Sequence, residues 1–268
     1  MNGHSANLAA LKRSASRIRR LQRLRPATLV SPVTRFLAVR RIIEAEGLKL
    51  FVDPTSHLGQ SLLNHGTYEP ETIAMFREHV RAGDTVLDIG ANEGFFSSMA
   101  ANIVGPNGRV IAVEPQSRLQ DVVEINLALN ASCPTHIIKN VVAETDAVEM
   151  EITLFPGNNT GASSLVRNYR WGATKETVTT ITPSTILGKV GVDRVDFVKI
   201  DVEGFEPEVI RSLLPLLRAK RIGKLLLDYH TQILSVRGID PQPTHDAVLA
   251  SGYKADGQVK FGYVMYTA

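Results

Sequence analysis

Cysteine is nearly absent from this chain, and its scarcity excludes several kinds of protein. Cys133 is the single cysteine among 268 residues. One thiol rules out an internal disulfide framework and a zinc site built from several cysteines, and it fits a reducing compartment. We therefore expect a cytoplasmic protein that is stabilised by a buried core, for which this length is sufficient.

Long apolar runs are missing as well. No segment approaches the roughly 18 consecutive apolar residues of a membrane-spanning helix. The N-terminal region has no apolar stretch of the length, about 7–15 residues, that a signal peptide requires. We expect neither feature in this chain.

Acidic residues are absent from residues 1–43, which contain ten Lys and Arg residues. The rest of the chain has 20 basic residues against 27 acidic ones, so a basic arm precedes an acidic body. This division argues against a general nucleic-acid-binding surface, and we expect no nucleic-acid partner. We interpret residues 1–45 as a basic N-terminal arm that is an amphipathic helix or partly disordered. Contact with an anionic membrane surface, docking to a partner and a frayed terminus remain open. No pattern indicates an oligomeric state.

The body shows alternating strand and helix patterns, which are typical of a parallel sheet with helices on both faces. Residues 46–80 form a predicted N-terminal cap, and residues 82–268 a Rossmann-like core. The core strands are predicted at 86–89, 109–113, 136–139, 195–200 and 224–229. Extra strands are predicted at 148–155 and 176–181, and closing strands near 253 and at 263–266. The fold class is therefore α/β, with a doubly wound, mostly parallel sheet and an N-terminal extension.

The turn after the first core strand carries the most informative motif. Residues 86–96 read VLDIGANEGFF, with Gly90 and Gly94 between a strand and a helix. Such a turn lets a ligand approach bare backbone at the carboxyl edge of a sheet. A dinucleotide fingerprint requires a second glycine where this chain has Asn92. The loop therefore favours a nucleoside ligand without phosphates, of which S-adenosylmethionine is the common one.

The second core strand ends on a carboxylate, Glu114, 24 positions after Gly90. A carboxylate at this strand tip can accept hydrogen bonds from both hydroxyl groups of a ribose. The two motifs together predict an adenosine site.

Ionisable residues also end the fourth and fifth core strands. Because side chains alternate along a strand, Lys199, Asp201 and Glu203 should share one direction at the cleft. His230 should emerge beside them from the fifth strand, which ends in Asp-Tyr-His. Two mechanisms remain open. In the first, His230 or Asp201 takes a proton from an acceptor hydroxyl, with Lys199 setting the local charge.

In the second mechanism, a divalent metal held by Asp201, Glu203 and His230 lowers the pKa of that hydroxyl. We favour the metal-free mechanism, because the second needs three ligands from two strands in an assumed geometry. Other chemistries lack their motifs. No Asn/Asp-Pro-Pro-aromatic motif follows the fourth strand, and G-x-S-x-G, H-E-x-x-H and Walker loops are absent.

The motifs together resemble those of the FkbM-type S-adenosylmethionine-dependent methyltransferases. The resemblance rests on YEPE (68–71), AGDTVLDIGANEGFFSSMAA (82–101), GRVIAVEP (108–115) and FVKIDVEGFEPEVI (197–210). It implies a class I methyltransferase fold, whose seven-stranded sheet has an antiparallel last strand. It also implies O-methylation as the commonest activity, often of sugars, polyketides or lipid-linked saccharides.

The resemblance also assigns site residues. The implied cofactor-binding residues are Asp88, Gly90, Ala91, Asn92, Gly94, Phe95, Glu114, Pro115, Asn140, Val141 and Asp201. The small-residue loop with Ser163 and Ser164 is implied to lie near the substrate. The basic arm is outside the resemblance, so nothing carries over to it.

The combined interpretation is an S-adenosylmethionine-dependent enzyme that methylates a hydroxyl of a sugar, glycolipid or secondary metabolite. One alternative is a protein that binds the cofactor without catalysis. Another is a nicotinamide-dependent oxidoreductase, which the missing second glycine and the absence of a Tyr-x-x-x-Lys pair near the fourth strand disfavour.

Overall fold

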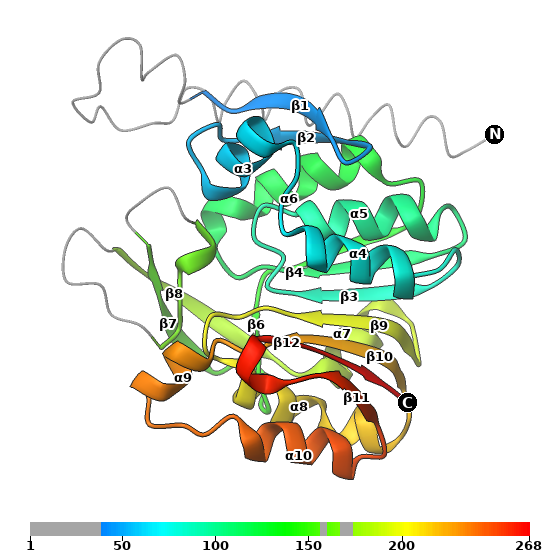
Figure 1. Ribbon diagram of the computed structural model, residues 1–268, viewed down its shortest axis with the longest axis vertical. Helices are drawn as coiled ribbons and strands as arrows, with labels where there is room; N and C mark the ends of the chain where they lie inside the picture. Colours follow the sequence, from blue (N-terminus) through cyan, green and yellow to red (C-terminus); the bar gives the residue numbers. More distant parts are fainter. Residues whose placement is uncertain (1–38, 156–159, 167–173) are drawn as a thin grey trace.

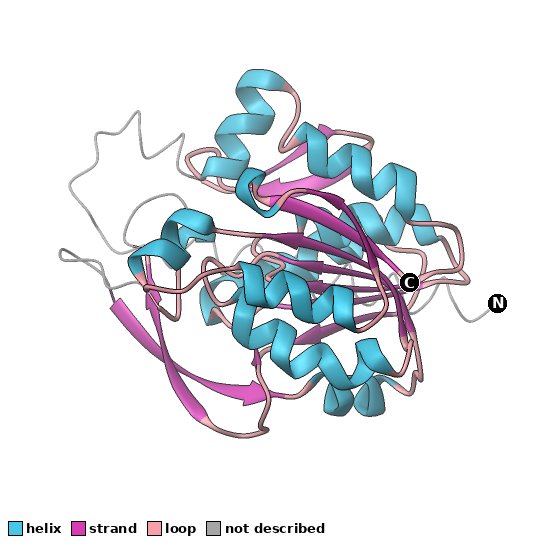
Figure 2. Cartoon of the chain, turned by 60° about the horizontal axis from the view of Figure 1, so that its bottom comes forward, coloured by secondary structure: helices cyan, strands magenta, loops and turns pink. Residues whose placement is uncertain are grey.

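The computed structural model describes residues 39–155, 160–166 and 174–268. Its centre is a seven-stranded sheet (Figures 1 and 2). In spatial order the strands are β11 (Lys254–Gly257), β12 (Tyr263–Thr267), β10 (Ile222–Asp228), β9 (Val195–Ile200), β3 (Thr85–Ile89), β4 (Arg109–Val113) and β5 (Thr135–Ile138). The strands from β10 to β5 run parallel, whereas β12 is antiparallel to both of its neighbours. The predicted doubly wound, mostly parallel seven-stranded sheet is confirmed.

Helices cover both faces of this sheet (Figure 2). One face carries α4 (Pro70–His79), α5 (Phe95–Val104) and α6 (Ser117–Asn130), and the other carries α7 (Pro183–Val190), α8 (Glu206–Arg218) and α10 (Gln242–Ala250). The strands are apolar on both sides because each side is covered. Along β10, Leu225 and Leu227 enter the core beneath α8, and Leu226 enters the core beneath α5.

An N-terminal hairpin lies beside α6, at the top of Figure 1. It consists of β1 (Arg41–Ala45) and β2 (Leu48–Val52), which pair antiparallel and precede α3 (His57–His65). Glu46 and Gly47 both have positive φ, 53° and 77°, as a tight hairpin turn requires. The structure therefore corrects the assignment of residues 41–45 to the arm. The rest of that arm, residues 1–38, lies outside the described residues. None of the described helices is long and apolar enough to cross a membrane.

The predicted cap packs tightly on the core. Phe76 of α4 is fully buried, and its ring centroid lies 5.0 Å from those of Phe96 and Phe197. The buried side chain of Asn126 in α6 accepts a hydrogen bond from the backbone N–H of Phe51 and donates one to the carbonyl oxygen of Glu93. Removing a ring as buried as Phe76 costs about 3–5 kcal/mol, so the cap is part of the same folded unit.

A smaller sheet projects beside the ligand side of the core. It consists of β6 (Val141–Val142), β8 (Thr174–Ile181) and β7 (Glu149–Leu154), with the 3-10 turn η1 (Thr160–Ala162) between β7 and β8. Ser164 bridges back to Thr153 of β7. The extra strands were predicted from sequence, whereas β6, α7 and α9 (Thr231–Val236) were not. A second 3-10 turn, η2 (Val259–Phe261), precedes β12.

Candidate active site

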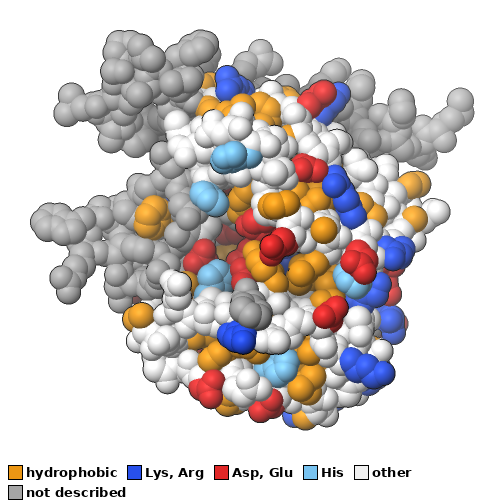
Figure 3. Space-filling model, in the orientation of Figure 1, with side chains coloured by type: hydrophobic (Ala, Val, Ile, Leu, Met, Phe, Trp, Pro, Cys, Tyr) orange, Lys and Arg blue, Asp and Glu red, His pale blue; other side chains and the backbone are white. Residues whose placement is uncertain are grey.

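A pocket opens at the carboxyl ends of β3, β4, β9 and β10, where the winding of the sheet reverses. Its volume, including the part open to solvent, is about 960 Å³, which suits a small molecule. Figure 3 shows acidic side chains and histidines gathered around a hollow on this face. Among the lining residues are five carboxylates and two histidines: Glu69, Glu114, Asp201, Glu203, Asp228, His57 and His230.

The turn after β3 brings bare backbone to the pocket. Gly90 has a φ of 87°, and a Cβ placed there would lie only 1.9 Å from the carbonyl oxygen of Asp201. Only glycine permits this close approach between the ends of β3 and β9. Asn92 also lines the pocket and has a φ of 50°. Glu69 and Glu203, likewise on the pocket wall, share this uncommon left-handed conformation, which often accompanies functional sites.

Glu114 follows β4 and is 3% exposed, yet its carboxylate lines the pocket. One oxygen accepts the backbone N–H of Asn92 at 2.8 Å, and the other accepts that of Gln116 at 2.9 Å. Burial raises the pKa of Glu114 to about 7, although the backbone hydrogen bonds from Gln116 and Asn92 oppose the rise. Each carboxylate oxygen retains lone pairs that a ribose hydroxyl can use.

The η1 segment is tied to this end of the pocket. The Thr160 hydroxyl donates to the side-chain oxygen of Asn92 at 2.8 Å, and Gln116 donates to the carbonyl oxygen of Thr160 at 3.3 Å. Arg118 reaches Ser163 at 2.8 Å and also hydrogen-bonds the side chain of Gln116. The predicted substrate-loop residue Ser163 therefore belongs to a hydrogen-bonded group that ties η1 to the Glu114 end of the pocket.

The wall beyond Glu114 becomes apolar. Val141, Val142 and Ile152 line it together with Asn140. The side-chain amide of Asn140 donates to the hydroxyl and the carbonyl oxygen of Thr179, so that side chain is held against β8. The aromatic face of a flat base such as adenine can pack against a wall of this composition. Pro115 lines the pocket as well.

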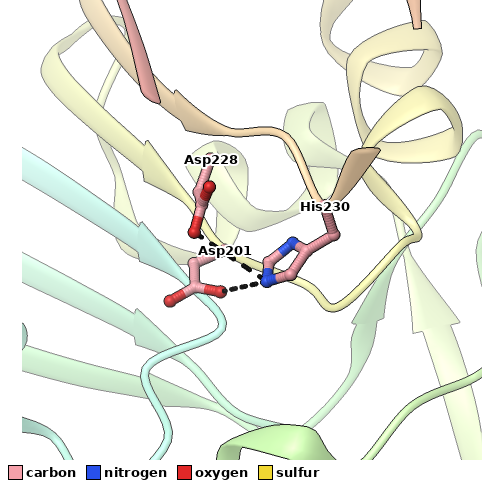
Figure 4. Close-up of side chains that lie close together, drawn as sticks. All are labelled: Asp201, Asp228 and His230. Carbon is pink, nitrogen blue, oxygen red and sulfur yellow. Dashed lines mark ion pairs between the residues drawn. The ribbon is translucent and has the colours of Figure 1, made fainter. Parts of the chain in front are cut away.

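At the opposite end, carboxylates surround one imidazole. The Nε2 atom of His230 lies 3.7 Å from Asp201 Oδ1 and 3.8 Å from Asp228 Oδ2 (Figure 4). Glu203 Oε2 also lies 3.8 Å from Nε2. These side chains come from the ends of β9 and β10. Side-chain alternation predicted Lys199 on this side together with Asp201 and Glu203, but Lys199 does not line the pocket.

Glu206 holds the other side of the same imidazole. Its Oε1 atom lies 2.8 Å from His230 Nδ1 and accepts the backbone N–H of Gly204 at 2.8 Å. Glu206 is the first residue of α8 and is fully buried. Because Nδ1 faces Glu206, Nε2 is the nitrogen that faces the pocket.

The electrostatics of this end differ from group to group. Burial lowers the pKa of His230, but the hydrogen bond to Glu206 and the charge of Asp201 outweigh it and raise the pKa to about 10. Burial, reinforced by the charge of Asp201, raises the pKa of Asp228 to about 6. Burial also raises the pKa of Asp201, but the charges of Lys199 and His230 outweigh it and lower that pKa.

Lys199 supplies its charge from behind the pocket wall. It is 2% exposed, and its Nζ lies 3.0 Å from Asp201 Oδ2 and 3.8 Å from Asp88 Oδ1. Its pKa is raised, because the charges of Asp201 and Asp88 outweigh the effect of burial. Asp88 is fully buried and accepts the Ser97 hydroxyl at 2.6 Å. Neither Lys199 nor Asp88 reaches the pocket surface.

Other residues predicted for the site also lie behind that surface. Those that do not line the pocket are Asp88, Ala91, Gly94, Phe95, Ser164 and Lys199. Gly94 and Phe95 begin α5, where Gly94 packs against Val123 and Phe95 against Tyr68. Ser164 turns its hydroxyl to the carbonyl oxygen of Glu203. Their neighbours in sequence face the ligand space, whereas these residues support the turns.

Many of the pocket-lining residues were not predicted from sequence, among them Asp228, Tyr68 and Glu69, and neither was the buried Glu206. Asp228 ends β10, and Tyr68 and Glu69 come from the turn before α4. A strand-end carboxylate two residues before His230 was a usable signal for Asp228. Glu206 offered none, because an acidic residue in the first turn of a helix is ordinary.

The candidate metal ligands in the structure differ slightly from the predicted ones. Among the described residues, Asp201, Asp228 and His230 each offer a ligand atom, all within 4.8 Å of one another. The predicted set had Glu203 in place of Asp228. Whether this group holds a metal stays a prediction.

Comparison with known proteins gives a consistent result. The model of the methyltransferase FkbM domain matches residues 88–249, more than half of the chain. The AMB antimetabolite synthetase AmbE of Pseudomonas aeruginosa is 24% identical over an alignment of 215 residues, which covers 68% of this chain and 10% of that protein. The methyltransferase sdnD of Sordaria araneosa is 30% identical over an alignment of 156 residues, which covers 48% of this chain and 60% of that protein.

The chain thus spans a tenth and three fifths of the lengths of these two relatives. Among solved structures, a putative rRNA-methylase from Clostridium thermocellum superposes with a TM-score of 0.44 at 14% identity, over 74% of this chain and 93% of that one.

Proposed function

The chain belongs to the FkbM family of S-adenosylmethionine-dependent methyltransferases, and we propose that it methylates a hydroxyl group of a sugar, glycolipid or secondary metabolite. The observation that carries this proposal is the juxtaposition in one pocket of a buried carboxylate, Glu114, and the acid–base cluster around His230. The first suits an adenosine and the second suits a reaction that releases a proton.

The residues at the cofactor end fit S-adenosylmethionine. Glu114 keeps lone pairs for the ribose hydroxyls, and Asn140 and Val141 stand at the apolar wall that suits adenine. Gly90 leaves the backbone bare beside them. When bound, this cofactor supplies an electrophilic methyl group on a sulfonium. The acidic lining favours a ligand with that positive charge.

The acceptor end must handle one proton. As the acceptor oxygen bonds to the methyl carbon and the carbon–sulfur bond breaks, the hydroxyl proton has to pass to a base. Asp201 is a weak base because Lys199 holds its carboxylate at 3.0 Å and its pKa is lowered. His230, with a pKa raised to about 10, already carries a proton at neutral pH.

Asp228 is the group best suited to take the proton. It lines the pocket, and its pKa of about 6 leaves it ionised at neutral pH yet more basic than an ordinary carboxylate. We therefore assign proton acceptance to Asp228 instead of the His230 or Asp201 predicted from sequence. His230 then orients the Asp228 carboxylate through its Nε2 atom.

The test measures S-adenosylhomocysteine release with a panel of hydroxylated acceptors. Asp228→Asn should lower kcat by about 100-fold or more, the scale of a lost general base, while cofactor affinity stays unchanged. Asp256→Asn, on the exposed strand β11, is the matched control and should behave as wild type. Full turnover by Asp228→Asn would remove Asp228 from the reaction.

The alternatives give different results in the same tests. A cofactor-binding protein without catalysis would bind S-adenosylmethionine and release no S-adenosylhomocysteine with any acceptor. A nicotinamide-dependent oxidoreductase would bind NAD more tightly than S-adenosylmethionine in a calorimetric titration. Family membership favours neither.

We propose that the transfer needs no metal. The positive charges of Lys199 and protonated His230 already compensate part of the negative charge of Asp201, Glu203 and Asp228. Turnover should therefore survive dialysis against EDTA. Loss of turnover that Mg²⁺ or Mn²⁺ restores would show instead that a cation bridges Asp201, Asp228 and His230.

A further inference from the structure

We propose that Glu206 is a positioning residue for the methyl transfer, because its buried carboxylate fixes the imidazole of His230 so that Nε2 faces the pocket. The role in transfer rests on the proposed function, but the contact itself can be tested without turnover.

The burial of Glu206 is the first observation. Its side chain is 0% exposed, and Oε2 has no hydrogen-bond partner among the described residues. Burying a carboxylate is costly unless it is paired, and an unsatisfied buried oxygen adds to that cost. Packing alone would be served better by an apolar side chain. The retained carboxylate therefore points to a task that needs its acceptor oxygens.

The contact of Glu206 with His230 is the second observation. Glu206 is the first residue of α8, His230 directly precedes α9, and the two are 24 positions apart in sequence. Oε1 of Glu206 lies 2.8 Å from His230 Nδ1 and also accepts the N–H of Gly204. The backbone bond fixes the carboxylate, so the carboxylate can fix the ring. An imidazole whose Nδ1–H is held in this way presents only Nε2 to its other side.

The third observation is that the Nε2 atom of His230, in this orientation of the ring, lies among the carboxylates of the pocket. Asp201, Glu203 and Asp228 stand 3.7–3.8 Å from it, and all three line the pocket with His230. Rotation of the ring would turn Nε2 away from these carboxylates and would leave Asp228 without its neighbour. Glu206 itself does not line the pocket, so it acts through His230 and does not touch substrate.

The same helix provides a matched control. Glu208, two residues further along α8, binds Arg237 at 2.7 Å. Arg237 also donates to the carbonyl oxygen of Gly204. This ion pair joins the same two segments as the bond between Glu206 and His230, but it is partly exposed and does not touch the imidazole. A purely structural clasp between the segments would make the two glutamates equivalent.

The experiment compares Glu206→Ala, Glu206→Gln and Glu208→Gln. The first readout is the proton NMR resonance of His230 Nδ1–H, which a hydrogen bond to a carboxylate moves downfield and protects from exchange, identified by its loss in His230→Gln. We expect it to vanish in Glu206→Ala, to persist at a shifted position in Glu206→Gln, and to be unchanged in Glu208→Gln. A resonance that persists unchanged in Glu206→Ala would overturn the proposed contact.

The second readout is kinetic. Glu206→Ala should lower kcat by about tenfold or more, while the KM for the acceptor and the affinity for S-adenosylmethionine change little. Glu206→Gln, whose amide oxygen can still accept from Nδ1, should recover part of kcat. The positioning role is wrong if Glu206→Ala and Glu208→Gln lower kcat equally. If Glu206→Ala does not fold, Glu206→Gln is compared with Glu208→Gln instead. Equal losses of kcat in these two variants would likewise contradict the positioning role.

The two proposals fail separately. If the wild-type chain binds S-adenosylmethionine but methylates no acceptor, the proposed function fails, and the resonance still tests whether Glu206 holds His230. If turnover is found but depends equally on both glutamates, the proposed function stands and the positioning role is lost.

Discussion

At the β3 and β4 end of the pocket, the bare backbone of Gly90 lies beside one carboxylate, Glu114, which two backbone N–H groups hold. At the β9 and β10 end, the lining groups are side chains that hold one another, with Lys199 and Glu206 buried behind them. Backbone geometry is set by local sequence, whereas a side-chain cluster needs partners from distant segments. The two ends should therefore fail in different ways when single residues are changed.

The largest effect is expected at Gly90, where the two ends meet. Gly90→Ala would place a Cβ 1.9 Å from the carbonyl oxygen of Asp201 at a φ of 87°, so β3 and β9 would have to separate. We expect a loss of roughly 3 kcal/mol or more in the free energy of unfolding, together with loss of cofactor binding. Denaturant unfolding and calorimetry measure the two effects.

Gly66→Ala is the control for Gly90. Gly66 ends α3 with a φ of 73°, and nothing lies within 4 Å of a Cβ placed there. Gly66→Ala tests the strain of the left-handed backbone without the close approach. It should lower the free energy of unfolding by about 1 kcal/mol. Equal losses in the two variants would show that the contact between β3 and β9 contributes nothing.

The next largest effect is expected at the acceptor end of the pocket, from the loss of the buried positive charge of Lys199. Lys199→Met leaves the buried Asp88 without its positive neighbour and leaves Asp201 with His230 alone, and breaking such a group costs about 3–5 kcal/mol. Lys175→Met, which breaks the exposed pair with Glu151, should cost at most about 1 kcal/mol. Chemical unfolding of both variants at neutral pH measures the contrast.

The pH dependence of the Lys199 variant sharpens this contrast. Burial raises the pKa of Asp201, but Lys199 and His230 outweigh it and lower the value. A carboxyl whose folded-state pKa is lowered contributes stability above its unfolded pKa and loses that contribution as pH falls through the folded value. The difference between wild type and Lys199→Met should therefore narrow below about pH 4. A gap that stays constant at all pH values would mean that the ion pairs do not cause the loss.

These two ends also differ in how far they could be predicted from sequence. Gly90, Asn92 and Glu114 stand in short motifs, so the turn and the strand tip were identified directly. Asp201 and His230 followed from side-chain alternation at strand ends. Glu206 did not, because its partner lies 24 residues away across a helix, and no sequence pattern records that approach.

Sequence position also overestimated the number of residues that face the ligand. Asp88, Gly94 and Phe95 belong to the motif, but Asp88 of β3 contacts Ser97 and Lys199 behind the pocket, and Gly94 and Phe95 pack at the start of α5. The strand β1 was missed because Arg40 and Arg41 read as part of the basic arm. Its pairing is set by the positive φ of Glu46 and Gly47, which the sequence pattern did not indicate.

A smaller effect on cofactor affinity is expected at Glu114. There, cofactor affinity and the stability of the free protein should change with pH in opposite directions. Glu114→Gln loses the charge that strengthens hydrogen bonds from ribose hydroxyls, and its NH2 group faces one of the backbone N–H donors of Asn92 and Gln116, so cofactor affinity should fall by about 1–3 kcal/mol. In the wild type, burial raises the pKa of Glu114 to about 7. Affinity should therefore rise as pH increases through 7, because the carboxyl ionises.

The stability of the free protein should move in the opposite direction. A carboxyl whose folded-state pKa is raised binds protons more tightly when folded, so its contribution to stability falls as pH rises from about 4.5 to about 7. Glu114→Gln should remove both pH dependences. Calorimetric titrations and unfolding curves across this range test them, and a variant that keeps the wild-type pH profile would exclude Glu114 as their cause.

The smallest effect is expected where η1 is tied to the turn after β3. Thr160→Val removes the hydrogen bond from the Thr160 hydroxyl to Asn92, worth about 0.5–1.5 kcal/mol. Because η1 is hydrogen-bonded to Asn92 and Gln116, which line the Glu114 end of the pocket, the loss should appear chiefly as faster cofactor dissociation in stopped-flow measurements, with kcat retained and stability lowered by no more than that amount. Thr177→Val, on the exposed face of β8, should change none of these quantities. If Thr160→Val instead lowered kcat and left dissociation unchanged, η1 would serve the acceptor end, and the division of the pocket into two independently built ends would fail.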